Sequence, residues 1–303
     1  MPKKNKPKRV VLTEEMMMIE YEESSKVSVM GFTLADEDMI LVSNVLKKLG
    51  DLATLRLASI SIGDEGMKYV VEGLRNITTL VEIIFANTGL ESESVRILTG
   101  ILGNNTALTI LDLSQNKIEG DGIQHLTLTE LRLTMNTIGD EGAQYLCDLL
   151  QNTTTLTTLQ IGNNDIGEEG IRHFADALKN NKTITTLDLN TNRIKDEGAR
   201  YLGDALRDNT TLNELNLGSS EIEAEGARLL GDGLRNNKSL TSLKLTGNSI
   251  KDEGVQHLLT ALENNIILND LDLAWTEFED GGKKAIDDYV KKTGHSVFQG
   301  FNA

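Results

Sequence analysis

Apolar and polar positions alternate along most of the chain in a pattern that keeps returning. The pattern reads Leu-x-x-Leu-x-Leu-x-x-Asn-x-Ile, and consecutive copies start 28 residues apart, except for one step of 20 residues. Such a fixed period is typical of a repeat protein, in which each unit buries its apolar face against its neighbours. The copies begin at Leu52, Leu80, Leu108, Leu128, Leu156, Ile184, Leu212, Leu240 and Leu268.

Each repeat predicts one short strand followed by one helix. In residues 156–189, Leu159 and Ile161 alternate with polar neighbours, which is the period of a strand with one buried face. Phe174 and Leu178 follow at the spacing of a helix with one apolar side. The chain is therefore expected to alternate strands and helices throughout the repeats.

Several polar or small positions also recur at fixed places in the repeat. In five of the nine repeats an asparagine after the strand can bond the backbone of adjacent turns through its amide, which predicts a buried ladder made of Asn116, Asn136, Asn164, Asn192 and Asn248. A glycine near each helix start is expected to let the helix approach the strand closely. Acidic residues at the helix starts predict helix capping, by Asp64, Asp140, Asp196 and Asp252. Asn180 and Asn181 are expected to end their helix in the left-handed conformation.

This 28-residue pattern resembles the leucine-rich repeat, and specifically its ribonuclease-inhibitor-like subclass. The resemblance covers about residues 52–290 and implies an α/β horseshoe solenoid of about nine repeats, with a parallel sheet on the concave side and helices on the convex side. Residues 27–51 look like a degenerate half-repeat that caps the first end. Residues 291–303 are expected to close the last repeat, and residues 1–26 form an arm that belongs to no repeat.

The 20-residue step shortens one repeat by eight residues compared with the others. The sequence after Ile118 runs into the next strand before a full helix could form. We therefore expect the second half of that helix to be missing, and Ile101 and Leu149 on the flanking helices to be less covered.

Net charge narrows the range of partners. The chain of 303 residues carries a formal charge of −16, although five of its first nine residues are Lys or Arg. Such an acidic body repels phosphate backbones, which argues against nucleic-acid binding by the folded part. The basic tip of the arm is expected to suit an acidic surface instead, with a solubilising tail as the simpler alternative.

Cysteine content and hydropathy bear on location. The single cysteine, Cys147, excludes an internal disulfide, and no apolar run approaches the ~20 residues of a membrane span. No signal peptide is recognisable at the N-terminus. These features favour the cytoplasm, with a nuclear, a cytoskeletal or ciliary, and a host-cell location left open.

Partner-binding candidates lie at the strand positions that point away from the core, since ligands of the resembled family bind across that surface. Ile84 and Ile110 are apolar there and are flanked by Arg56 and Arg132, a composition found in binding hot spots. Trp275, the only tryptophan, is expected to anchor a ligand at the other end. Local packing around the short repeat, and packing of Trp275 into the C-terminal cap, are the alternatives. The full candidate set is Arg56, Glu82, Ile84, Ile110, Asp112, Arg132, Met135, Asp188, Glu214, Asp270, Asp272 and Trp275.

No group of residues in the sequence points to catalysis. His125, His173 and His257 occupy the same position in different repeats, so they are spread along a column and are interpreted as structural. Cys147 has small or apolar counterparts and is expected to be a packed thiol. We therefore expect no enzyme activity, no cofactor and no metal.

The function that follows is a protein-interaction scaffold, acting as a monomer or as a subunit of a larger complex. One alternative is a regulator of a small GTPase resembling Ran GTPase-activating protein. Another is a leucine-rich repeat effector or a sensor module of the innate-immune type.

Overall fold

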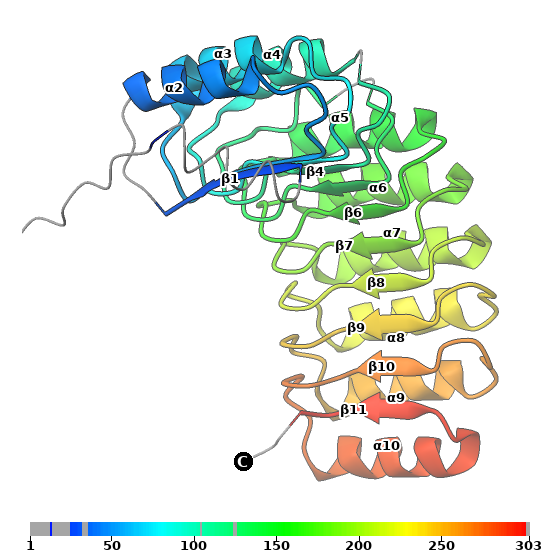
Figure 1. Cartoon of the computed structure of the whole chain (residues 1–303). Helices are drawn as coiled ribbons and strands as arrows, with labels where there is room; N and C mark the ends of the chain where they lie inside the picture. Colours follow the sequence, from blue (N-terminus) through cyan, green and yellow to red (C-terminus); the bar gives the residue numbers. More distant parts are fainter. Residues whose placement is uncertain (1–12, 14–24, 32–35, 104, 124–125, 301–303) are drawn as a thin grey trace, which may run out of the picture. The chain divides into compact units, whose positions relative to one another are not determined.

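The computed structural model describes residues 13, 25–31, 36–103, 105–123 and 126–300 (Figure 1). The chain divides into two compact units, which meet in the sequence at the 20-residue repeat. The first unit comprises Met1–Ile118 and Gly122–Leu128, and the second comprises Glu119–Asp121 and Thr129–Ala303.

The first unit is built from parallel strands that alternate with helices. Its elements are β1 (Lys26–Met30), α2 (Asp36–Leu46), β2 (Thr54–Ala58), α3 (Gly63–Leu74), β3 (Glu82–Ile84), α4 (Ser92–Leu102) and β4 (Ile110–Asp112). Neighbouring strands pair residues 28 apart, as in Thr54 with Glu82. Residues 27–51, expected to form a capping half-repeat, contribute most of a complete strand and a complete helix.

The second unit continues the same alternation (Figure 1). Its elements are β5 (Glu130–Arg132), α5 (Gly139–Asn152), β6 (Thr158–Gln160), α6 (Glu168–Asn180), β7 (Thr186–Asp188), α7 (Lys195–Asp208), β8 (Glu214–Asn216), α8 (Ala224–Leu234), β9 (Ser242–Lys244), α9 (Lys251–Leu262), β10 (Asp270–Asp272), α10 (Asp280–Thr293) and β11 (Ser296–Phe298). Strands β2 to β10 correspond to the nine repeats. The C-terminal tail adds β11, which pairs in parallel with β10.

The apolar positions of the repeat make the core between the sheet and the helices. Leu159 and Ile161 from the strand segment and Phe174 and Leu178 from α6 are all fully buried, as the alternation predicts. Figure 1 shows the helices of the second unit on one side of its strands, and none of the described helices covers the opposite face of its sheet.

The predicted asparagine ladder is present and buried. The side-chain oxygen of Asn192 accepts hydrogen bonds from the backbone N–H groups of Asn164 and Ile166, both at 3.1 Å. Its amide nitrogen donates to the carbonyl oxygens of Ile161 and Leu189 at 3.1 and 2.8 Å. One side chain thus joins two consecutive repeats, which satisfies backbone groups that the bend after the strand would otherwise leave unpaired.

A second asparagine column connects the repeats behind the helix ends. The amide nitrogen of Asn181 donates to the carbonyl oxygen of Leu150 at 2.7 Å, and its oxygen accepts from the backbone N–H of Ile184 at 2.8 Å. The expectation of a left-handed helix end is wrong, because Asn181 is extended (φ −66°, ψ 136°). The same donation to a carbonyl 31 residues earlier is made by Asn181, Asn209, Asn237 and Asn265.

Three of the four acidic residues at the helix starts, Asp140, Asp196 and Asp252, do cap a helix, but it is the helix of the following repeat, whereas Asp64 accepts from the side-chain hydroxyl of Ser94 in α4. Asp140 in α5 accepts hydrogen bonds from the backbone N–H groups of Gly167 and Gly170, which open α6, at 2.6 and 3.1 Å. Asp252 in α9 accepts from Glu279 and Gly282 in the same way for α10. The caps therefore stabilise neighbouring repeats against each other as well as the helices themselves.

The recurrent glycine near the helix start makes room for the preceding repeat. A Cβ at Gly170 would lie 2.7 Å from the carboxylate of Asp140, and one at Gly254 would lie 2.7 Å from the Cα of Ala224. The glycine therefore lets its helix approach the first turn of the preceding helix. The expectation that it lets the helix approach the strand is wrong.

Acid should weaken the α9–α10 cap. Hydrogen bonds from the backbone N–H groups of Glu279 and Gly282 lower the pKa of Asp252 below its usual value. A carboxyl with a lowered folded-state pKa adds stability above its unfolded pKa, and this contribution is lost as the pH falls through the folded pKa.

We therefore expect the melting temperature of Asp252→Asn to lie below that of the natural chain at pH 6, with the gap closing as the pH approaches 3. Thermal melts across this range measure it. Asp287→Asn, an exposed change on α10, is the control and should show no such convergence. A gap that stays constant with pH would contradict the capping role.

The short repeat loses more than half of its helix. Among the described residues between β4 and β5 the chain forms no helix, only bends, a turn, irregular backbone and one isolated β-bridge from Lys117 to Glu91, so the expected first half of a helix is wrong. Ile101 and Leu149 are both half-exposed, as predicted. The equivalent position in helices with neighbours on both sides is a buried glycine or alanine: Gly73, Ala177, Ala205, Gly233 and Ala261.

Candidate interaction surfaces

The outward face of the second unit is a regular grid of side chains. Paired residues on adjacent strands lie about 4.8 Å apart, and alternate residues along a strand point to the same side. The first outward row reads Glu130, Thr158, Thr186, Glu214, Ser242, Asp270 and Ser296. The second reads Arg132, Gln160, Asp188, Asn216, Lys244, Asp272 and Phe298.

Acidic and amide residues at the strand ends have a structural role that sequence reasoning missed. The Oδ1 of Asp188 accepts from the backbone N–H of Asn190 at 2.9 Å, and the Oδ1 of Asp272 accepts from that of Ala274, also at 2.9 Å. Asp112 and Asn216 make the same bond to the residue two positions on. These side chains therefore hold the turn after the strand, as Asx turns do, and they retain a second polar atom.

The candidates in the first unit lie on three adjacent strands. Ile84 of β3 pairs with Arg56 of β2 and with Asp112 of β4, whereas Ile110 of β4 pairs with Glu82. The two isoleucines are therefore diagonal neighbours, and both are half-buried. The Nε of Arg56 is buried and has no hydrogen-bond partner among the described residues.

Arg132 and Met135 belong to the second unit, and they differ in how freely each side chain could contact a partner. Arg132 donates to the carboxylate of Glu130 at 2.7 Å on the same strand, so much of its charge is balanced internally. Met135 is 47% exposed and has a positive φ of 60°.

Trp275 lies just beyond the end of β10 and is 65% exposed, so the alternative that it packs into the C-terminal cap is wrong. Its φ of 58° is shared by the equivalent residues of the other repeats, which include Asn163, Ser219 and Gly247. Bulky side chains are uncommon in this left-handed conformation, although Gln115, Met135 and Thr191 also adopt it at the same repeat position. Phe298 on β11 is 53% exposed.

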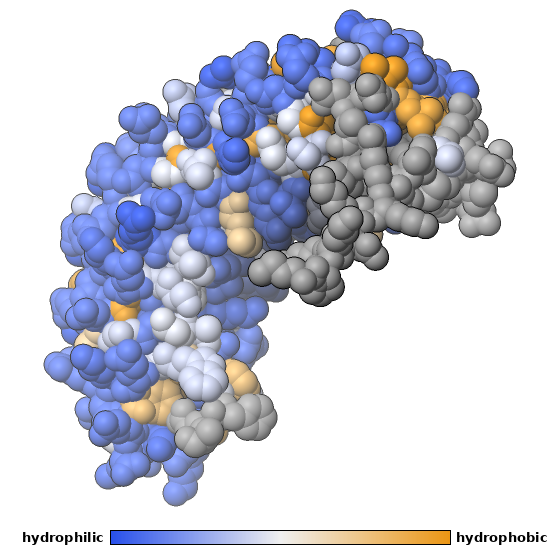
Figure 2. Space-filling model, turned by 90° about the vertical axis from the view of Figure 1, so that its left-hand side faces the viewer, coloured by the Kyte–Doolittle hydropathy of each residue, from blue (hydrophilic) through white to orange (hydrophobic). Residues whose placement is uncertain are grey.

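The side of the molecule toward which the strands point is shown in Figure 2. A pale stripe of residues with near-neutral hydropathy runs between hydrophilic residues there.

A shallow pocket of about 170 Å³ opens on the outward face of β6–β9. The sequence predicts two of its residues as partner-binding candidates, but it does not predict a pocket here. A single polar residue on an outward strand position is usually just exposed to solvent. Its lining residues are Gln160, Thr186, Leu187, Asp188, Glu214, Leu215, Asn216, Ser242 and Lys244.

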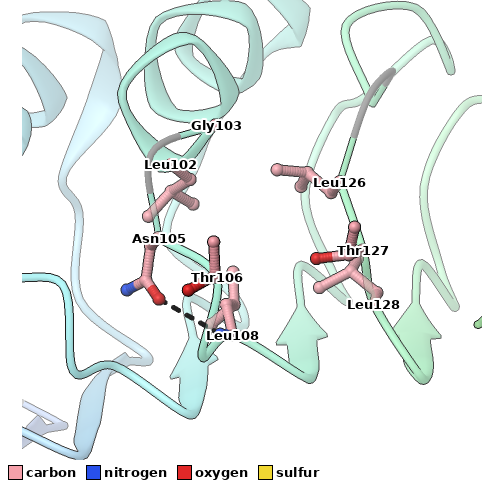
Figure 3. Close-up of a pocket in the computed structure, with 8 residues that line it drawn as sticks. All are labelled: Leu102, Gly103, Asn105, Thr106, Leu108, Leu126, Thr127 and Leu128. Carbon is pink, nitrogen blue, oxygen red and sulfur yellow. Dashed lines mark hydrogen bonds between the residues drawn. The ribbon is translucent and has the colours of Figure 1, made fainter.

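A smaller cavity of about 70 Å³ lies in the first unit, beside the short repeat (Figure 3). Leucines line much of it, and Figure 3 shows Leu126 and Leu128 across the gap from Leu102 and Leu108. The buried amide nitrogen of Asn105 has no acceptor among the described residues, although its counterparts in the second column each have one. A space of this size holds a few water molecules at most, so we assign it no ligand.

Among the described residues, Cys147, His173 and His257 lie on three different helices. Burial raises the pKa of the Cys147 thiol far above its usual range, so the thiol is a packed, unreactive group. His173 lies 3.6 Å from Glu169 on α6, and His257 is exposed on α9. His125 lies outside the described residues. Within the described part of the chain, no three His, Cys, Asp or Glu residues are grouped so that they could hold a metal ion.

Repeated strand–helix units joined by an asparagine ladder define a leucine-rich repeat protein. The Leucine Rich repeat family pattern matches six segments, at residues 104–126, 124–147, 152–175, 180–203, 208–231 and 236–259. The chain belongs to this family. The ribonuclease-inhibitor-like subclass is compatible with the match and stays a prediction.

One solved structure with a similar fold is "Leiomodin-1 Actin-Binding Site 2 (ABS2)". It is 22% identical, with a TM-score of 0.42, over 51% of this chain and 88% of that one. No curated protein matches the chain in sequence. In the described part of the chain, no helix is both long and apolar enough to cross a membrane. GTPase regulation and an effector or sensor role stay predictions.

Proposed function

We propose that this chain is a non-enzymatic scaffold that binds a protein partner through the outward faces of its sheets. Within the second unit, buried asparagine columns and helix caps hold neighbouring repeats together, so its outward rows are fixed in position before any partner arrives. A rigid surface loses little conformational entropy on binding, which favours affinity. Leucine-rich repeats spread such residues over an extended face, which suits a macromolecule better than a small substrate.

The observation that carries this proposal is the exposed Trp275. Tryptophan is among the residues that contribute most to protein interfaces. Here it stands in a left-handed position where glycine or asparagine would cost less free energy, and most of its ring is exposed. Neither its packing nor its backbone accounts for a tryptophan at this position, whereas contact with a partner does.

Replacing Trp275 with alanine should weaken partner binding by about 2 kcal/mol, roughly thirtyfold in affinity. The partner is first captured from the native source with the immobilised chain, and the affinity of the purified pair is then measured by calorimetry. Ile266→Ala is the matched control, because Ile266 is even more exposed but lies before β10 and away from its C-terminal end. Equal affinities for the Trp275 and Ile266 variants would contradict the proposal.

The other candidate residues are tested within each unit. Ile84→Ala probes the first unit, and Arg132→Ala probes the second. We propose that these residues also contact the partner, although the Glu130–Arg132 pair makes the arginine a weaker anchor than its sequence context indicates.

The N-terminal arm is proposed to reach an acidic surface on the partner. Most of residues 1–26 lie outside the described residues. However, β1 already begins at Lys26, and the carbonyl oxygen of Ser25 accepts a hydrogen bond from the backbone N–H of Ala53. A truncation that leaves the sheet intact should therefore remove residues 1–24. The sequence predicts an arm that is two residues longer.

A further inference from the structure

The pocket on β6–β9 combines negative charge with polar groups of fixed orientation. Glu214 is exposed, and its carboxylate forms no hydrogen bond or ion pair within the described residues. Asp188 is its diagonal neighbour on β7. Its Oδ1 is engaged by the backbone N–H and the side-chain amide of Asn190, at 2.9 and 2.6 Å. The second oxygen of Asp188 and both oxygens of Glu214 are left to accept hydrogen bonds from outside.

The rest of the lining adds further acceptors and limits the pocket's size. Gln160 and Asn216 contribute side-chain amides on either side of Asp188, and Thr186 contributes a hydroxyl. At about 170 Å³ the pocket is smaller than the roughly 300–1,000 Å³ of a typical small-molecule site, so it has room for one side chain and none for a folded element. The pocket therefore fits a single donor-rich cationic group.

The pocket lining holds two carboxylates, Asp188 and Glu214, and one cation, Lys244, so it stays net negative. Lys244 lies on β9 beside Asn216, so it is a diagonal neighbour of Glu214, whereas it is two strands, or about 10 Å at the backbone, from Asp188. Lys244 is exposed and makes no ion pair within the described residues. Its repulsion instead disfavours a ligand with several adjacent positive charges.

We propose that this pocket receives the side chain of an arginine from the partner protein, held by the carboxylates of Asp188 and Glu214. The inference rests on the scaffold function and names the chemistry by which that partner is recognised. Arginine fits better than lysine, because its planar guanidinium presents five N–H donors that can reach two carboxylates and an amide oxygen at once. A lysine ammonium carries only three donors and is more strongly hydrated.

The test is a titration of the isotope-labelled full chain with N-acetyl-arginine amide, followed by the backbone amide resonances of Asp188, Glu214 and Asn216. We expect saturable shifts centred on these residues, and weaker binding of N-acetyl-lysine amide. Glu214→Gln should weaken arginine binding about fivefold, because it removes the charge from the charge-assisted hydrogen bonds. Glu253→Gln on α9 is the matched control, with the same change of charge at another exposed site, and should leave the affinity unchanged.

Equal loss in the two variants would show attraction to an acidic protein in general and would overturn the proposal. Equal binding of the arginine and lysine probes, or shifts centred elsewhere, would also overturn it. This test is independent of the test of the scaffold function. If the pocket did not bind arginine, capture of a partner that depends on Trp275 would still support the scaffold function.

Discussion

Replacing Asn192 with alanine should lower the free energy of unfolding of the second unit by about 3 kcal/mol, since each buried backbone group left unpaired costs about 1–3 kcal/mol. The change removes the acceptor of two backbone N–H groups and the donor to two carbonyl oxygens in one step. Urea unfolding followed by circular dichroism measures the loss.

Lys244→Ala is the control for this variant. Lys244 is exposed, so its removal should change stability by no more than about 0.5 kcal/mol. Asn192→Ser should recover part of the loss, because Ser220 holds the same ladder position with a hydroxyl that donates to the carbonyl oxygen of Gly218 at 3.1 Å. Equal unfolding midpoints for Asn192→Ala and Lys244→Ala would contradict the ladder.

Gly233→Ala should also destabilise the second unit strongly, by about 3 kcal/mol, at the upper end of the usual cost of overpacking. A Cβ at Gly233 in α8 would lie 2.1 Å from the carbonyl oxygen of Gly203 in α7. Backbone atoms cannot rotate away as a side chain can, so the two helices would have to separate and break contacts along their length.

Gly100→Ala is the matched control, because Gly100 is also helical but has open space around its Cβ position. Alanine there should leave stability unchanged or raise it by about 0.5–1 kcal/mol, since glycine is the poorer helix former. Thermal melts of the two variants decide the comparison. A Gly233→Ala protein as stable as the natural chain would show that α7 and α8 are not packed this closely.

Much of the fold follows from the sequence because the repeat itself encodes contacts. A period of 28 residues places equivalent residues on adjacent strands, and the paired residues of β6, β7 and β8 are indeed 28 apart. The ladder asparagines were predictable for the same reason, since a buried amide that recurs after each strand must find backbone partners in the next repeat.

The candidate site was predictable only in part. The sequence indicated which strand positions point outward and singled out Trp275. It did not show that Arg132 is bonded to Glu130, or that the Oδ1 of Asp188 holds a turn, because both depend on side-chain geometry at the strand ends. Fewer hydrogen-bond acceptors are therefore available to a partner than the number of charged residues on the outward face indicates.

The sequence by itself determined the leucine-rich repeat class, the register of the strands, the buried ladder and the place of the irregular repeat. Each of these depends on periodicity, which is a property of the chain alone. Only the tertiary structure decided that Asp140 and Asp252 cap the helices of the following repeats and that Asn181 bonds across repeats. It also decided that the short repeat has no helix in its described part, and that Gln160, Asp188, Glu214 and Lys244 line one pocket. These features depend on how closely neighbouring repeats approach, a distance set by packing between residues that the repeat pattern does not specify.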